Sequence, residues 1–214
     1  MIRKRLAFWL ALLVLVASLS CAAPPSSRQW TPEGELAVAS FHQPRQKWEL
    51  LGTRERISGE EAPDQQLKGL TQKLLQELEE RGFVSLRGPG SVARCREIAL
   101  SEAPASPQSA RRYWASVGRC VSAEAILVPQ LTHWRQREGG PWGVERSASV
   151  ALHLVLLDTE EGEVLRFFQF KEEQKSLSEN LLDIGSFIRR GGKWVKAEDL
   201  AAEGIRRGLR DMGL

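Results

Sequence analysis

The sequence has few of the residues from which metal and catalytic sites are built. It holds three histidines and three cysteines in 214 residues. The histidines are His42, His133 and His153, and none has a second ligand three or four residues away, so no metal site is predicted. His153 falls inside an expected strand, on the face opposite Leu152 and Leu154, where we expect it to be half-exposed.

The motifs of nucleophilic and phosphate chemistry are also missing. There is no Gly-x-Ser-x-Gly elbow, and the glycine-rich segments 88–90 and 139–143 lack the Lys-Ser/Thr pair of a phosphate loop. The sequence therefore predicts no catalytic residue and no cofactor. An envelope enzyme stays as a lesser hypothesis, which requires titratable groups that converge in the fold, with His133 beside a carboxylate.

Without its N-terminal residues, the chain has no excess of positive or negative charge. The formal charge of +3 arises from 30 Lys and Arg against 27 Asp and Glu, and Arg3, Lys4 and Arg5 account for the difference. The rest of the chain is balanced, and no basic stripe carries interleaved aromatic residues, so no nucleic-acid partner is predicted.

The apolar run near the N-terminus is too short for a membrane span. Residues 6–20 give roughly 15 apolar or small residues, whereas a spanning helix needs about 20. The run follows a basic start and ends in Ala17-Ser-Leu-Ser-Cys21, which is typical of a secretory signal. A plain signal peptide and an uncleaved anchor remain as alternatives.

The end of this run resembles the bacterial lipobox. Ser20 precedes Cys21 as that motif requires, although Ser18 stands where Leu is usual and Leu19 is displaced by one position. The resemblance implies cleavage before Cys21 and attachment to the membrane through its acyl chains, of which more than one is needed for stable anchoring. Ala22, in place of Asp, implies an address at the outer membrane.

These features predict three segments. We expect residues 1–20 to be a lipoprotein signal peptide, 21–33 the lipidated cysteine with a short tether, and 34–214 one domain on the periplasmic face. About 190 residues can bury one substantial core. Because ten tether residues, rich in Pro and Ser, reach at most about 33 Å, the domain should work close to the membrane.

Two cysteines remain if Cys21 carries lipid. Cys95 and Cys120 are an even pair in an oxidising compartment, where a disulfide is plausible. Two small buried thiols are the alternative, since free cysteine is commonly buried.

Apolar periodicity predicts an α+β domain, with a mixed sheet of about five strands and helices packed on one face. Strands are expected at 34–41, 83–86, 125–134, 150–156 and 164–170, and the last two form a hairpin. Helices are expected to begin near Asp64, Val92, Pro107, Ser176 and Lys196. Residues 42–65 are polar and are expected to form a long loop.

Two stretches resemble signatures of a group of bacterial envelope proteins. Trp114–Val128 resembles a helix that enters a strand, with Ser122 where Gly is usual, and Leu156–Leu165 resembles a strand-turn-strand unit. The group includes the curli-secretion lipoprotein, the penicillin-binding-protein activator lipoproteins and the amino-terminal domain of TolB. The resemblance implies a small α/β sandwich and carries no functional residue with it.

Neither of two specialised roles in that group suits this chain. Charged residues in segment 130–147 are incompatible with the lipid-facing hairpins of a pore. A short tether is incompatible with the second role, a penicillin-binding-protein activator at the outer membrane, which must reach across the periplasm.

Two sets of residues are candidates for contact with a partner. Arg189, Arg190, Lys193 and Trp194 surround a Gly-Gly turn, and they suit an anion, a lipid headgroup or a protein partner. They also suit the ordinary end of a helix. Trp134 and Trp142 flank a polar loop, where they either mark a contact surface or hold the loop against the sheet.

The function that these observations predict is a lipid-anchored, non-enzymatic interaction or assembly module that docks on an envelope protein. The alternative is a small-ligand or lipid-binding protein with a cleft between segment 130–147 and Trp194, which requires a concave apolar pocket.

Overall fold

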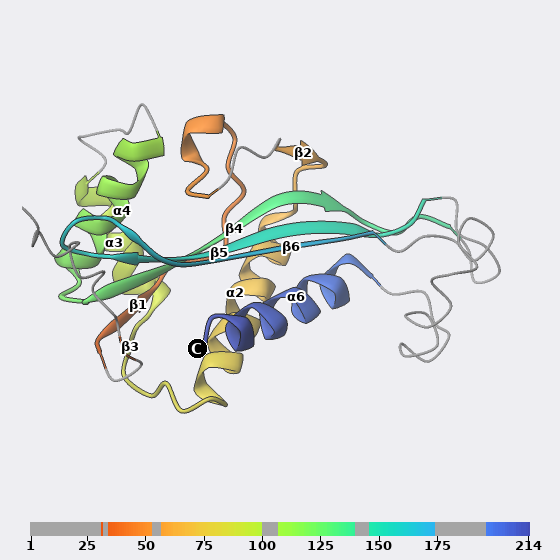
Figure 1. The fold of residues 1–214 in the computed structure, drawn as a ribbon. Helices are drawn as coiled ribbons and strands as arrows, with labels where there is room; N and C mark the ends of the chain where they lie inside the picture. Colours follow the sequence, from red (N-terminus) through yellow and green to blue (C-terminus); the bar gives the residue numbers. More distant parts are fainter. Residues whose placement is uncertain (1–30, 32–33, 53–56, 100–106, 140–145, 174–195) are drawn as a thin grey trace, which may run out of the picture.

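The computed structural model describes residue 31 and residues 34–52, 57–99, 107–139, 146–173 and 196–214. They form an α+β domain, as the sequence predicts (Figure 1). The helical elements are η1 (Lys47–Glu49), α2 (Asp64–Glu79), α3 (Pro89–Ala99), α4 (Pro107–Cys120) and α6 (Ala197–Asp211). The strands are β1 (Leu36–Val38), β2 (Ser58–Gly59), β3 (Leu86–Arg87), β4 (Ala125–Arg135), β5 (Ser149–Asp158) and β6 (Val164–Glu173).

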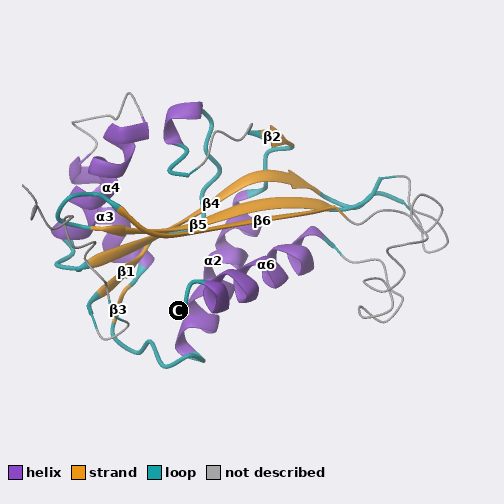
Figure 2. Cartoon of the chain, in the orientation of Figure 1, coloured by secondary structure: helices purple, strands orange, loops and turns teal. Residues whose placement is uncertain are grey.

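The six strands form one mixed sheet in the order β3-β1-β4-β5-β6, and β2 pairs with β4 at His133 and Trp134. β1 runs parallel to β3 and β4, while β4, β5 and β6 are antiparallel neighbours. The predicted hairpin is confirmed as β5 and β6, which with β4 form the long ribbon of Figure 2. β4 continues through Pro129 and reaches Arg135.

The helices lie on both faces of the sheet, so the prediction that they pack on one face was wrong (Figure 1). α2 and α6 cover one face, where Leu127 and Leu152 belong to the core. α3 and α4 cover the other, where Ile126 and Val155 belong to a second core. β5 is buried at all ten positions. Because neighbouring strand residues point to opposite faces, such a strand needs cover on both sides.

Close packing joins α6 to β5 and β6. A Cβ atom on Gly204 would lie 2.7 Å from a ring carbon of Phe170, and one on Gly208 would lie 2.7 Å from Leu154 Cδ1. These two glycines face the sheet four residues apart, on one side of the helix. Their missing side chains let the helix axis approach the aromatic residues of β6.

Residues 41–52 cross the middle of the α3–α4 face. Leu51 N donates a hydrogen bond to Gln130 Oε1, and Gly52 packs against the ring of Phe167. His153, paired in register with Gln130, lies beneath this crossing and is 0 % exposed. The expectation that His153 is half-exposed was therefore wrong, because this segment covers the sheet at that position.

Candidate functional site

Several of the predicted site residues lie outside the described part of the chain. These residues are Cys21, Trp142, Arg189, Arg190, Lys193 and Trp194. Lipidation of Cys21 and the basic contact near Trp194 stay predictions.

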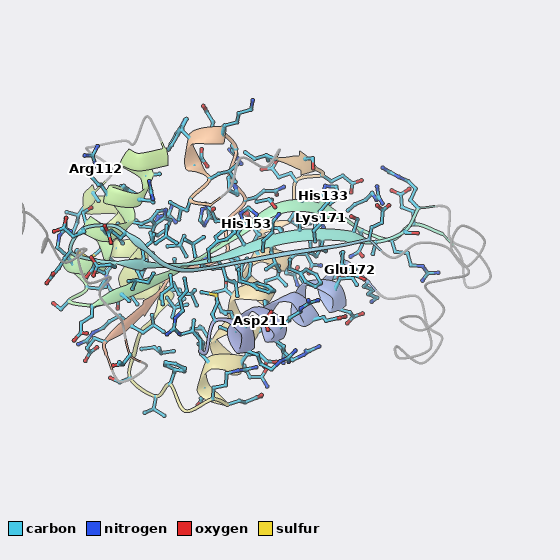
Figure 3. The ribbon with its side chains drawn as sticks, in the orientation of Figure 1. Arg112, His133, His153, Lys171, Glu172 and Asp211 are labelled. Atoms are coloured by element: carbon cyan, nitrogen blue, oxygen red, sulfur yellow. A yellow bond between two sulfur atoms is a disulfide. The ribbon has the colours of Figure 1, made fainter. Side chains whose placement is uncertain are left out.

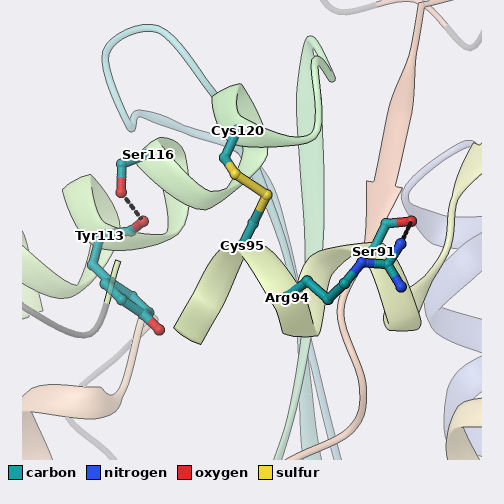
Figure 4. The surroundings of a disulfide bond; sticks show 6 residues. All are labelled: Ser91, Arg94, Cys95, Tyr113, Ser116 and Cys120. Carbon is teal, nitrogen blue, oxygen red and sulfur yellow. Dashed lines mark hydrogen bonds between the residues drawn. A yellow bond between two sulfur atoms is a disulfide. The ribbon is translucent and has the colours of Figure 1, made fainter. Parts of the chain in front are cut away.

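The two remaining cysteines meet between α3 and α4 (Figure 4). Cys95 and Cys120 are joined by a disulfide whose Cα atoms are 5.9 Å apart. α3 and α4 both contribute side chains to the core on this face. The bond therefore fixes the two helices against each other.

Trp134 does not lie on a contact surface. Its side chain is 2 % exposed and belongs to the core beneath α2 and α6. A bulge between Leu131 and His133 shifts the register of β4. As a result Trp134 points into the core while His133 points to the opposite face. The other interpretation, that Trp134 and Trp142 hold the loop against the sheet, stays a prediction because Trp142 lies outside the described residues.

His42 lies where segment 41–52 contacts the sheet. Its ring lies 5.5 Å from the ring of Trp114, between centroids, and Gln130 Nε2 is 3.3 Å from its Nε2. Burial, with a smaller effect from the Arg96 guanidinium, lowers the pKa of His42 to about 4. The same Arg96 lies over the Trp114 ring, 4.9 Å from its centroid. The neutral imidazole is the form that this packing favours.

A polar group of side chains gathers where β4 to β6 extend past α3 and α4. We call it the polar end: Ser58, His133, Arg135, Lys171 and Glu173. The register places His133 and Lys171 on opposite sides of Ala151, and Figure 3 labels these two side chains. The register also places Arg135 and Glu173 on opposite sides of Ser149, on the same face.

Contacts hold most of the polar end in place. Ser58 Oγ is 3.0 Å from His133 Nδ1, and Arg135 binds Glu173 and the carbonyl of Ser147. Burial, followed by the charges of Arg135 and Lys171, lowers the pKa of His133 below its usual value. Lys171 is exposed beside these groups.

The chemistry of the polar end suits recognition better than catalysis. A serine nucleophile needs a base that a third group orients. Here the carboxylate of Glu173 is bound to Arg135, and His133 Nδ1 faces Ser58. Within the described residues no group of three metal-ligating side chains is found. What remains is a set of exposed donors and acceptors on rigid strands.

Gly59 is the one sequence signal for this arrangement. Residues 42–65 were expected to be loop, and the pairing of Ser58 and Gly59 with β4 was missed. Gly59 has φ +88°, and a Cβ there would lie 2.5 Å from the carbonyl oxygen of Trp134. Only glycine allows so close an approach.

The two signature stretches meet at the opposite end of the sheet. Thr159 Oγ1 donates to the carbonyl of Ala123, and Arg119 donates to the carbonyls of Thr159 and Glu160. Ser122 has φ +56°, in the left-handed region. That conformation explains why Gly is usual at this position.

Comparisons with known proteins found likenesses only among solved structures. No family model and no curated protein matches the chain. The LpoB C-terminal domain from Salmonella enterica is 16% identical at a TM-score of 0.42, over 69% of this chain and 87% of that one. PelC from Paraburkholderia phytofirmans, a dodecamer, is 15% identical at a TM-score of 0.45, over 86% of this chain and 90% of that one.

Lipoprotein GNA1162 from Neisseria meningitidis is 11% identical at a TM-score of 0.38, over 74% of this chain and 98% of that one. All three likenesses are below 20% in identity and below 0.5 in TM-score. Nothing of their function is transferred to this chain. No helix in the described ranges is long and apolar enough to span a bilayer.

Proposed function

We propose that this chain is a lipid-anchored envelope protein whose domain acts as a non-enzymatic interaction module near the outer membrane. Two observations support its location. The order of basic, apolar and small residues before Cys21 is that of a lipoprotein signal. The Cys95–Cys120 disulfide suits an oxidising compartment.

The polar end is the observation that carries the proposed docking role. Its strands are fixed by pairing with β5, and α6 packs against β5 and β6 on the other face. Such a surface is organised before a partner arrives, which reduces the entropy lost on binding. Ser58 and Lys171 are exposed there, while His133 and Arg135 are half-buried.

Small-ligand binding has weaker support. A hollow of about 270 Å³ lies among Arg119, Ser122, Ala123, Glu124, Thr159 and Glu160. Drug-sized ligands usually occupy apolar pockets of about 300–1,000 Å³. This hollow is smaller than that, and the Arg119 guanidinium in it is already bound to two carbonyl oxygens.

Fractionation of cells that produce the full chain tests the anchor. We expect the protein in the outer-membrane fraction, with a fatty-acid label on it, and Cys21→Ala should move it to the soluble fraction without label. Ala22→Ser is the matched control and should change nothing. Membrane attachment and labelling that survive Cys21→Ala would overturn the proposal.

Photo-crosslinking tests the docking surface. A photoreactive residue at Ser58, in the polar end, should capture one envelope protein in cells. The control position is Ile98, which is 73 % exposed on α3 at the other end of the sheet. Capture of the same protein from both positions, or from neither, contradicts docking at the polar end.

A further inference from the structure

Two neighbouring rows of side chains cross the polar end on the face opposite α6. In the first row, Arg135 on β4 binds Glu173 on β6 across β5. In the second row, His133 and Lys171 lie on either side of Ala151, and Figure 3 labels both. The first row is therefore closed by opposite charges, whereas the second row contains no acid.

Lys171 supplies a positive charge to the second row. Its side chain is exposed, and no described residue forms an ion pair with it. The acids that lie near this row have partners of their own: Glu173 is bound to Arg135, and Glu60, which follows β2, is bound to Arg146. The ammonium group is therefore open to an acid from outside the chain.

β2 holds the imidazole ring of His133 from the side of the sheet edge. Ser58 Oγ is 3.0 Å from Nδ1 of this ring, and a Cβ on Gly59 would lie 2.8 Å from the same atom. No described residue bonds to the other nitrogen, Nε2. Because each imidazole nitrogen serves one partner, Nε2 is the atom that can donate to a further acceptor.

The charges around His133 indicate the sign of that acceptor. Burial is the largest cause of its lowered pKa, and the charges of Arg135 and Lys171 add to it, while the charge of Glu173 opposes them. Two cations and one anion leave an excess of positive charge around the ring. A carboxylate in the second row would offset this excess and would accept charge-assisted hydrogen bonds.

We propose that the partner of the polar end is a protein with an acidic segment, one carboxylate of which binds between Lys171 Nζ and His133 Nε2 above Ala151. The proposal rests on the docking role of the polar end and names the chemistry that is recognised there. β4 and β6 are two strand spacings apart, roughly 9.5 Å. Side chains that rise from them can hold one carboxylate, with a hydrogen bond of about 2.8 Å on either side.

The observations favour a protein carboxylate over an anionic membrane. A lipid surface is attracted by clusters of several basic residues. Here Arg135 is already neutralised by Glu173, so the second row offers one cation and one imidazole on strands fixed by pairing. That arrangement fits a single anionic group.

Binding of a carboxylate in this row should draw a proton onto His133. An imidazolium donates from both nitrogens, to Ser58 Oγ on one side and to the carboxylate on the other. The groups that face the ring are Ser58 from β2, Arg135 from β4, Ala151 from β5, and Lys171 and Glu173 from β6. Histidine is the side chain that ordinarily changes charge between pH 5 and 8, so affinity should rise as the pH falls from about 7 to about 5.5.

Titration of the full chain in a neutral detergent with a hexaglutamate peptide tests the recognition, with the NMR signals of the histidine rings as the readout. The peptide should move the His133 signals and raise the pKa of His133, and hexalysine should do neither. Lys171→Gln should weaken binding about two- to five-fold, as expected for one exposed ion pair. Lys68→Gln is the matched control, exposed on α2, and should leave the affinity unchanged. His133→Gln should remove the pH dependence.

Three results of this titration would overturn the proposal. The first is that hexaglutamate in the millimolar range leaves the His133 signals unmoved. The second is that Lys171→Gln binds the peptide as tightly as the parent chain. The third is that phosphatidylglycerol vesicles move the His133 signals where hexaglutamate does not, which would make an anionic membrane the occupant.

Crosslinking in cells separates this proposal from the docking role itself. With the photoreactive residue at Ser58, Lys171→Glu should reduce capture of the partner several-fold, whereas Lys68→Glu should not. Capture at full yield in Lys171→Glu would overturn the acidic partner and leave the docking role in place. Absence of capture without either substitution would instead contradict the docking role.

Discussion

The two ends of the sheet differ in how they are covered. At the end that carries α3 and α4, helices cover both faces, and a disulfide joins α3 to α4. At the polar end α6 covers one face, while the other carries His133, Arg135 and Lys171. The covered end has apolar residues on both faces of each strand, whereas the polar end alternates. β5 is therefore buried along its whole length, whereas β4 and β6 belong to the core at one end and carry exposed or half-buried polar side chains on one face at the other.

The largest expected effect comes from a cavity in the covered end. Ile126 is 0 % exposed in the core beneath α3 and α4. Ile126→Ala should lower the free energy of unfolding by about 2–5 kcal/mol, since the surrounding side chains collapse only partly into the space. Denaturant unfolding measures the loss.

The matched control is the same substitution on an exposed surface of the same end. Ile98 is 73 % exposed on α3, and Ile98→Ala should change stability by no more than about 0.5 kcal/mol. Equal effects at the two positions would contradict the described packing.

A smaller effect is expected at His42, where segment 41–52 contacts the sheet. The pKa of His42 is about 4 in the folded state, against 6.5 for the ordinary side chain. The unfolded chain therefore binds more protons between these values, so stability should fall as the pH drops from about 6.5 to 4. The full shift corresponds to at most about 3 kcal/mol.

His42→Gln should flatten that pH dependence, which unfolding curves at several pH values measure. His133→Gln is the control at the polar end, where the pKa of His133 is also lowered, but around a less buried ring. Burial acts to raise the pKa of the Glu77 carboxyl, but hydrogen bonds and charges from Arg81 and Lys73 together lower it, so Glu77 affects the pH dependence only below its ordinary value of 4.5. A slope above pH 4.5 that His42→Gln leaves unchanged would exclude His42 as its source.

The smallest expected effect lies in the turn between α4 and β4. Ser122 has φ +56°, and Ser122→Gly should raise stability by about 1 kcal/mol because glycine adopts this conformation without strain. Ser116→Gly, inside α4, should instead lower it by roughly 0.5–1 kcal/mol. A loss of stability in Ser122→Gly would show that its side chain has another role.

Most elements of the fold could be predicted from local patterns. The leucines of α2 recur at helical spacing, Gly82 follows that helix with φ +92°, and the glycine in the turn at 162 marks the hairpin. The candidate site was much harder to predict from the sequence. His133 could be singled out, but Ser58 lies 75 residues earlier, in a segment with no apolar period.

The sequence by itself determined which residues share a face of a strand that has no bulge, and where most of the helices begin, because these follow from the two periods of the backbone. Only the tertiary structure decided what covers each face. Helices on both sides, the crossing of residues 41–52 over His153, and the inward turn of Trp134 after a bulge all depend on contacts between distant segments. Local periodicity carries no information about such contacts.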